Sequence, residues 1–110
     1  MEGQKLQIQE ELLLAKQSRL EGNEGRARVC ARRAAGAAVK EYFELRGIAH
    51  QEENAIQALL VLRQSGDLPH RVLKALDWLV QRVNEEHNLP PDVDLIHEAG
   101  IVIQYVDVDG

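Results

Sequence analysis

The chain has 110 residues, of which 45% are hydrophobic and 4% aromatic, and its formal net charge is −5 at pH 7. This length and hydrophobicity are typical of a single folded domain over residues 1–110 and exclude an intrinsically disordered chain. The acidic balance argues against a general nucleic-acid binder. No apolar run is long enough to span a membrane, and Cys30 is the one cysteine, so no intrachain disulfide can form. We therefore expect a soluble cytoplasmic protein with no membrane contact.

The charge is divided unevenly along the chain. Residues 1–50 contain nine Lys and Arg against seven Asp and Glu, whereas residues 51–110 contain four against eleven. Two surfaces of opposite sign could steer self-association or define one basic patch, and they could equally be ordinary solubility charge.

The first predicted element is a helix over residues 4–21. Leucines recur in it every seven residues and other apolar residues flank them, which is the pattern of an amphipathic helix. The predicted core-facing stripe comprises Leu6, Leu13 and Leu20, with Ile8, Leu12 and Ala15 on its flank. A short turn containing Gly22 ends the helix and Asn23 can cap the next one, so the first two helices should be antiparallel.

The second predicted helix, over residues 24–46, is the element around which the bundle should be built. Small residues and then larger ones follow one stripe, comprising Ala27, Ala31, Ala34, Ala38, Tyr42 and Leu45. Alanines let a second backbone approach closely, and the aromatic end should fill the wider gap where the helices splay. Gly36 costs about 1 kcal/mol relative to alanine inside a helix, which indicates a packing reason for it.

Two shorter helices are predicted next. The third covers residues 51–64 and is broken by the Ser-Gly-Asp sequence over 65–67. Pro69 suits the first turn of the fourth helix, with Asp67 as its cap. This helix should run on to the residues just before Pro90.

The terminal segment should be capped by Asp92 or Asp94. One helical face would carry Val93, Ile96, Gly100 and Ile103. The β-branched run over residues 100–106 would also suit a strand. We interpret the segment as a helix because no partner strand is visible elsewhere, and the chain as a whole predicts an all-α bundle of four to five helices with up-and-down connections.

Four segments carry a resemblance to a known family. They are the Gly-containing turn EGNEGRARV, the alanine-rich run ARRAAGAAVKEYFELRGI, the short helix over 50–62 and the closing DLIHEAGIVIQYV. Together they resemble the HEPN superfamily of small helical-bundle proteins over nearly the whole chain, although Gly36 stands where the family more often has a larger residue. The resemblance implies a HEPN-like up-and-down bundle that dimerises. It also implies one of two roles, a metal-independent ribonuclease of toxin–antitoxin and defence systems or a non-catalytic binding module beside a nucleotidyltransferase.

The ribonuclease branch of this superfamily uses an Arg followed, after four to six residues, by a His. Arg82 and His87 have this spacing. The His can transfer protons near neutral pH while a 2′-hydroxyl attacks the adjacent phosphate, and the Arg can stabilise the charge that develops there. Two glutamates between them would repel an RNA phosphate. The alternative is that Arg82 and His87 are solvated residues at a helix end.

The densest basic cluster lies in the second helix, where Arg28 and Arg32 are one turn apart and Arg33 follows. It could contact a phosphate, RNA or a second subunit, or it could pair with acidic residues. Trp78 could anchor a partner surface or be buried under the terminal helix. Glu98, near the start of the last helix, is interpreted as a surface residue.

No other pattern points to a cofactor or a metal. The four histidines lack metal-ligand spacing and there is no Gly-rich phosphate loop. Cys30 is interpreted as a buried small hydrophobic residue rather than a reactive thiol. We therefore predict no metal and no cofactor.

Three functions are consistent with these patterns. The first is a non-catalytic HEPN-like binding or interaction protein, a homodimer that acts with a nucleotidyltransferase partner or with a nucleotide or RNA ligand. The second is a metal-independent endoribonuclease of HEPN type using Arg82 and His87. The third is a helical adaptor of the tetratricopeptide kind, of which the first two helices would form one unit. The sequence favours the non-enzymatic function.

Overall fold

The computed structural model describes residues 2–48, 54–81 and 93–109. It contains five helices in these ranges: α1 (Glu2–Leu20), α2 (Glu24–Leu45), α3 (Ala55–Arg63), α4 (His70–Val80) and α5 (Leu95–Asp109). No strand occurs in the described residues, so the prediction of an all-α bundle is confirmed, as is the helix over residues 100–106.

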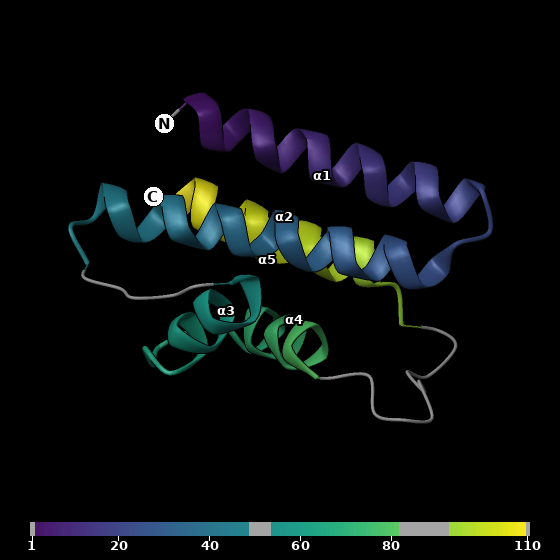
Figure 1. The fold of residues 1–110 in the computed structure, drawn as a ribbon. Coiled ribbons are helices and arrows are strands. Elements are labelled where there is room, and N and C mark those ends of the chain that lie inside the picture. Colours follow the sequence, from purple (N-terminus) through teal and green to yellow (C-terminus); the bar gives the residue numbers. More distant parts are fainter. Residues whose placement is uncertain (1, 49–53, 82–92, 110) are drawn as a thin grey trace.

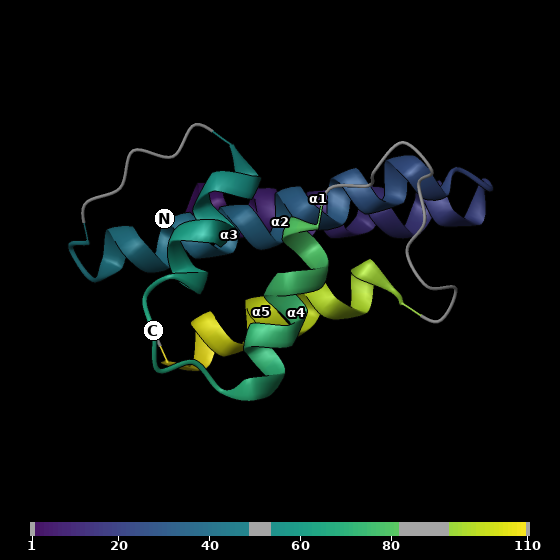
Figure 2. The ribbon, with the colours of Figure 1, turned by 90° about the horizontal axis from the view of Figure 1, so that it is seen from below.

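The long helices α2 and α5 lie side by side, α1 lies on one side of this pair, and the short helices α3 and α4 lie on the other side (Figures 1 and 2). α1 and α2 are antiparallel, as the short turn predicted. α5 lies beside α2 and runs in the same direction, because α3 and α4 bring the chain back before it starts (Figure 1). α2 packs against α1, α3 and α5, which makes it the central helix.

The turn between α1 and α2 has the predicted chemistry. Gly22 adopts the left-handed conformation that ends a helix, with φ of 81°. Asn23 caps α2 by accepting a hydrogen bond from the backbone N–H of Arg26 over 3.1 Å. These local signals fix where α1 stops and where α2 begins.

The alanine ridge of α2 is buried from Ala27 to Ala38, as predicted. Ala35, Val39 and Phe43 are buried as well, because neighbours cover α2 on three sides. The ridge does not continue to the end of the helix. Leu45 is 56% exposed, so the aromatic end fills only part of the gap where the helices diverge.

Gly36 has the packing reason that its position indicated. A Cβ atom at Gly36 would lie 2.5 Å from the Cβ and 2.6 Å from the Cα of Ala55, the first residue of α3. Only a residue without a side chain lets the start of α3 approach the α2 backbone this closely. α3 begins at Ala55 with Asn54 as its cap, and residues 51–53 of the predicted third helix lie outside the described residues.

The predicted core-facing stripe of α1 is wrong. Leu6, Leu13 and Leu20 are exposed, and over residues 5–20 of α1 the buried residues are Ile8, Ala15 and Ser18. The flank of the predicted stripe therefore faces the core. The physical reason is the alanine ridge opposite, because close backbone approach leaves room for Ala15 and Ser18 but not for a line of leucines.

The predicted cap and length of the fourth helix are also wrong. α4 begins at His70, after Pro69, and no side chain caps it. Asp67 has a positive φ of 55° and lies in the connecting turn. The helix ends at Val80 because Gln81 is extended, with φ of −63° and ψ of 111°, whereas the prediction continued it toward Pro90.

α5 is a helix with a different buried face from the one predicted. Asp94 caps it, accepting hydrogen bonds from the backbone N–H groups of Ile96 and His97. The buried apolar residues described in α5 are Leu95, Ala99, Val102 and Val106, whereas Val93, Ile96, Gly100 and Ile103 are half-buried. The segment is apolar nearly all round, so its periodicity could not select one face.

Candidate functional site

The most exposed apolar surface of the described residues lies on α1. Leu6 is 57%, Leu13 66% and Leu20 88% exposed. Spaced seven residues apart, they form one line along the helix, on the side opposite the buried Ile8 and Ala15. Figure 1 shows α1 at the edge of the fold, with α2 and α5 on its inner side and no other helix on its outer side. We call Leu6, Leu13 and Leu20 the leucine line.

Charged residues flank the leucine line asymmetrically. At about 100° of rotation per residue, Lys5 and Lys16 fall on one side of the line, and Glu10 and Glu21 on the other. Glu21 follows the last helical residue but still donates a helical hydrogen bond to the carbonyl of Gln17 over 3.0 Å. All four charged residues are exposed, and none pairs with another described residue.

The basic cluster of α2 is not gathered into one site. Arg28 Nε lies 4.0 Å from Glu24 Oε2, one helical turn earlier. Arg32 donates from Nε to the carbonyl of Leu79 over 2.8 Å and from Nη2 to the carbonyl of Gln81 over 3.3 Å. Burial, and then the charge of Arg28, lower the pKa of the Arg32 guanidinium. Arg32 therefore binds the carbonyl end of α4.

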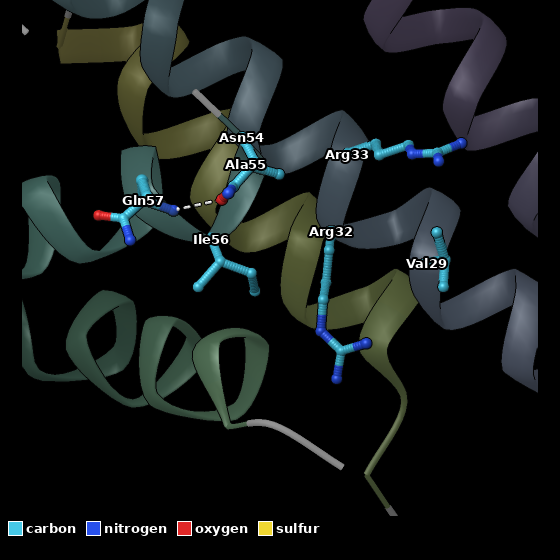
Figure 3. Close-up of a pocket in the computed structure, with 7 residues that line it drawn as sticks. All are labelled: Val29, Arg32, Arg33, Asn54, Ala55, Ile56 and Gln57. Atoms are coloured by element: carbon cyan, nitrogen blue, oxygen red, sulfur yellow. Dashed lines mark hydrogen bonds between the residues drawn. The ribbon is translucent and has the colours of Figure 1, made fainter. Parts of the chain in front are cut away.

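Arg32 and Arg33 both line a hollow of about 430 Å³ between α2 and α3 (Figure 3). Their side chains diverge, since Arg32 extends toward the end of α4 and Arg33 toward α1 (Figure 3). The start of α3 closes the hollow, where Asn54 accepts a hydrogen bond from the N–H of Gln57. The two guanidinium groups do not converge on one point, and a phosphate, RNA or dimer contact for Arg28, Arg32 and Arg33 stays a prediction.

Trp78 is half-buried against the core and lines a hollow of about 370 Å³ beside Arg71 and Glu98. Glu98 is only 7% exposed and accepts two hydrogen bonds of 2.9 Å from the Arg71 guanidinium, so its interpretation as a surface residue is wrong. The buried carboxylate is paired across the α4–α5 contact. Trp78 as a partner surface stays a prediction.

The predicted catalytic pair, Arg82 and His87, lies outside the described residues. Cys30 is 2% exposed, which confirms its interpretation as a buried residue, and burial and then Glu11 raise the pKa of its thiol. The described residues hold no group of three or more His, Cys, Asp or Glu side chains placed to bind a metal. Within them, no helix has the length and apolarity needed to cross a membrane.

Comparisons of the chain with protein-family models, with curated protein sequences and with solved structures found no match. The HEPN resemblance accordingly stays a prediction. The leucine line, which the sequence had assigned to the core, is the candidate functional site that the structure adds. Its sequence signal was the seven-residue spacing itself, which is also the spacing of helices that pair with a partner.

Proposed function

We propose that the chain is a non-catalytic, HEPN-like interaction protein that forms a homodimer through the leucine line of α1. The observation that carries the proposal is the exposure of Leu6, Leu13 and Leu20 on the outer side of the bundle. A line of exposed leucines rimmed by charged residues is typical of a helix that contacts another helix.

The charges that flank the leucine line favour a second copy of the same chain. When two copies of α1 lie parallel about a twofold axis, the Lys side of each faces the Glu side of the other. With the leucines at the d positions of a heptad, Lys16 and Glu21 hold the g and e positions, whose side chains meet in a parallel coiled coil, and Lys5 and Glu10 lie on the same two sides of the line. An antiparallel pair would place Lys beside Lys and Glu beside Glu.

The proposal is tested by the mass of the protein in solution. The wild-type chain should sediment at twice its 12.4 kDa mass at high concentration and dissociate on dilution. Leu13→Glu places a charge at the middle of the contact in both copies, and should weaken association at least a hundredfold. Val61→Glu is the matched control, because Val61 is an exposed apolar residue on α3, away from the leucine line.

Two results would contradict the homodimer. One is a wild-type chain that stays monomeric at millimolar concentration. The leucine line would then have to contact a helix of a different protein. The other is equal association by Leu13→Glu and Val61→Glu, which would place the contact elsewhere. A nucleotidyltransferase as a further partner, and RNA or a nucleotide as a ligand, rest on the HEPN resemblance alone.

A further inference from the structure

The hollow of about 370 Å³ that Trp78 lines is found where α4 packs against α5 (Figure 2). Its volume lies at the lower end of the range of about 300–1,000 Å³ that is usual for small-molecule sites, so it suits a ligand of one ring and a short chain. Its wall combines an aromatic ring with basic side chains. The described residues that line it are His70, Arg71, Lys74, Trp78, Val93 and Glu98.

The four wall residues of α4 share one face of the helix. At 3.6 residues per turn, positions 70, 71, 74 and 78 fall within an arc of about 100°. Residues 51–110 contain four Lys and Arg against eleven Asp and Glu, and two of these four, Arg71 and Lys74, stand on this arc. Trp78, the only tryptophan of the chain, stands on it as well. Basic and aromatic side chains are thus gathered at one hollow within the acidic half of the chain.

The charges on the wall favour a ligand with a single negative charge. Arg71 donates two hydrogen bonds of 2.9 Å to the carboxylate of Glu98, so these two charges offset each other. Lys74 is exposed and forms no ion pair with another described residue. The first turn of α4 adds a partial positive charge, and no side chain caps it. A group with two negative charges would exceed the one unpaired cation and would lie close to the Glu98 carboxylate.

Trp78 gives the hollow a preference for the uncharged part of the ligand. Its indole is half-buried against the core and lines the hollow. Two aromatic rings in contact attract each other more than the apolar area that they bury would require. Val93 adds apolar surface to the same wall. The hollow therefore favours a ligand with an aromatic ring.

We propose that this hollow binds a small aromatic carboxylate, whose ring contacts Trp78 and whose carboxylate pairs with Lys74. His70 and the N–H groups of Arg71 that Glu98 does not use are further donors for the carboxylate. The site goes beyond the proposed function and does not depend on the homodimer, because α4 and the start of α5 form it, whereas the leucine line is on α1.

The test uses 3-phenylpropanoate as the probe and the indole N–H resonance of ¹⁵N-labelled protein at pH 7 as the reporter. Because the chain has one tryptophan, this resonance belongs to Trp78, and it should shift in a saturable way. Two probes of the same skeleton isolate the charge, since 3-phenylpropan-1-ol removes it and 3-phenylpropylamine reverses it. 3-Phenylpropanoate should bind about fivefold more tightly than either of them, or more. Phenyl phosphate, with nearly two negative charges, should bind more weakly than 3-phenylpropanoate.

Two variants and one control locate the binding. Lys74→Gln removes the unpaired cation and should weaken 3-phenylpropanoate binding about threefold or more while leaving 3-phenylpropan-1-ol binding unchanged. Arg26→Gln makes the same change of charge at an exposed position of α2 and should bind 3-phenylpropanoate like the wild type. In Trp78→Leu, followed through the backbone amide of Lys74, the ratio of the affinities for 3-phenylpropanoate and 3-cyclohexylpropanoate should fall about threefold or more.

The helical circular dichroism and melting temperature of each variant establish that it is folded. Lys74→Gln changes an exposed side chain, so it and the probe series in the wild-type chain decide the proposal even where Trp78→Leu does not fold.

Four outcomes would overturn the proposal. Equal affinity for 3-phenylpropanoate and 3-phenylpropan-1-ol would show that the basic side chains contribute nothing. Equal 3-phenylpropanoate affinity of Lys74→Gln and the wild type would place the carboxylate elsewhere. An indole resonance that no probe shifts would exclude Trp78 from any site for these ligands. Tighter binding of phenyl phosphate than of 3-phenylpropanoate would assign the hollow to phosphate esters in place of carboxylates.

Discussion

Arg19, in the last turn of α1, donates a hydrogen bond from Nη1 to Oδ1 of Asp94 over 2.9 Å, across 75 positions of the sequence. The same guanidinium donates from Nε and Nη2 to the two carboxylate oxygens of Glu24, over 3.0 and 2.7 Å. Since Glu24 lies in the first turn of α2 and Asp94 caps α5, Arg19 joins three helix ends.

These contacts affect the acidity of both carboxyl groups. The hydrogen bond from Arg19 lowers the pKa of Glu24 below its usual 4.5. Burial by itself would raise the pKa of Asp94, but the hydrogen bonds from Arg19 and from the His97 and Ile96 amides outweigh it and lower the pKa below 3.8. Both carboxyl groups thus stabilise the folded chain when they are ionised.

The first prediction concerns Arg19→Ala. It should lower the free energy of unfolding by about 1 kcal/mol at pH 7, because the pair is partly exposed and the geometry is bidentate. Glu24 and Asp94 contribute fully to the free energy of unfolding when the pH is above their ordinary pKa values. This contribution is lost as the pH falls through their lowered pKa values in the folded chain. The difference between variant and wild type, measured by urea unfolding, should therefore shrink below about pH 4.

Arg63→Ala is the matched control for Arg19→Ala. Arg63 pairs with Asp77 on the exposed surface between α3 and α4, with no third helix end involved. Its removal should lower the free energy of unfolding by less than about 0.5 kcal/mol. A loss for Arg19→Ala that is the same at pH 7 and pH 3 would contradict the role assigned to the two carboxylates.

The second prediction compares two glycine-to-alanine changes inside helices. Gly36→Ala should lower the free energy of unfolding by about 1–3 kcal/mol despite its better helix propensity, because the new Cβ would overlap the backbone of Ala55. Gly100→Ala, in α5, places its new Cβ more than 4 Å from any atom beyond the adjacent backbone of its own helix, and should raise the free energy of unfolding by about 0.5–1 kcal/mol. Thermal and urea unfolding measure both, and stabilisation by Gly36→Ala would show that α3 does not approach α2 this closely.

The third prediction separates two neighbouring arginines. Arg32→Met should lower the free energy of unfolding by about 1–2 kcal/mol, since the carbonyls of Leu79 and Gln81 lose their donor at the end of α4. Arg33→Met should change it by less than about 0.5 kcal/mol, because Arg33 is exposed. Arg33 is then the residue with which to test the predicted phosphate contact by RNA titration. A larger loss for Arg33→Met than for Arg32→Met would reverse these roles.

The fourth prediction tests the orientation of the homodimer. Changing Lys5 and Lys16 to Glu makes both sides of the leucine line acidic and should weaken self-association about tenfold or more. Changing Glu10 and Glu21 to Lys in the same chain exchanges the acidic and basic sides of the leucine line and should restore self-association to the wild-type strength. In an antiparallel dimer, the variant with all four changes would still place like charges side by side, and it would not associate more strongly than the double variant. Sedimentation of the double and quadruple variants therefore decides between the two orientations.

The candidate sites show where sequence reasoning was limited. The seven-residue spacing of Leu6, Leu13 and Leu20 was visible, but a leucine repeat indicates a buried stripe and an intermolecular contact equally well. The burial of Glu41 in α2, which is 8% exposed, gave no signal at all, because a glutamate within a helix is usually exposed. Its burial is set by α1 and α5, neither of which is close to it in sequence.

Local chemistry in the sequence determined the helical elements and several of their ends. Gly22 supplies a left-handed turn, Asn23 and Asp94 accept from free backbone N–H groups, and each signal acts within a few residues. The alanine ridge of α2 likewise identified the central helix. Only the tertiary structure decided which faces of α1 and α5 are buried and that α4 ends at Val80. Those outcomes depend on contacts between segments far apart in the sequence: Arg32 of α2 donates to the carbonyl of Leu79 at the end of α4, and the buried face of α1 packs against the alanine ridge of α2.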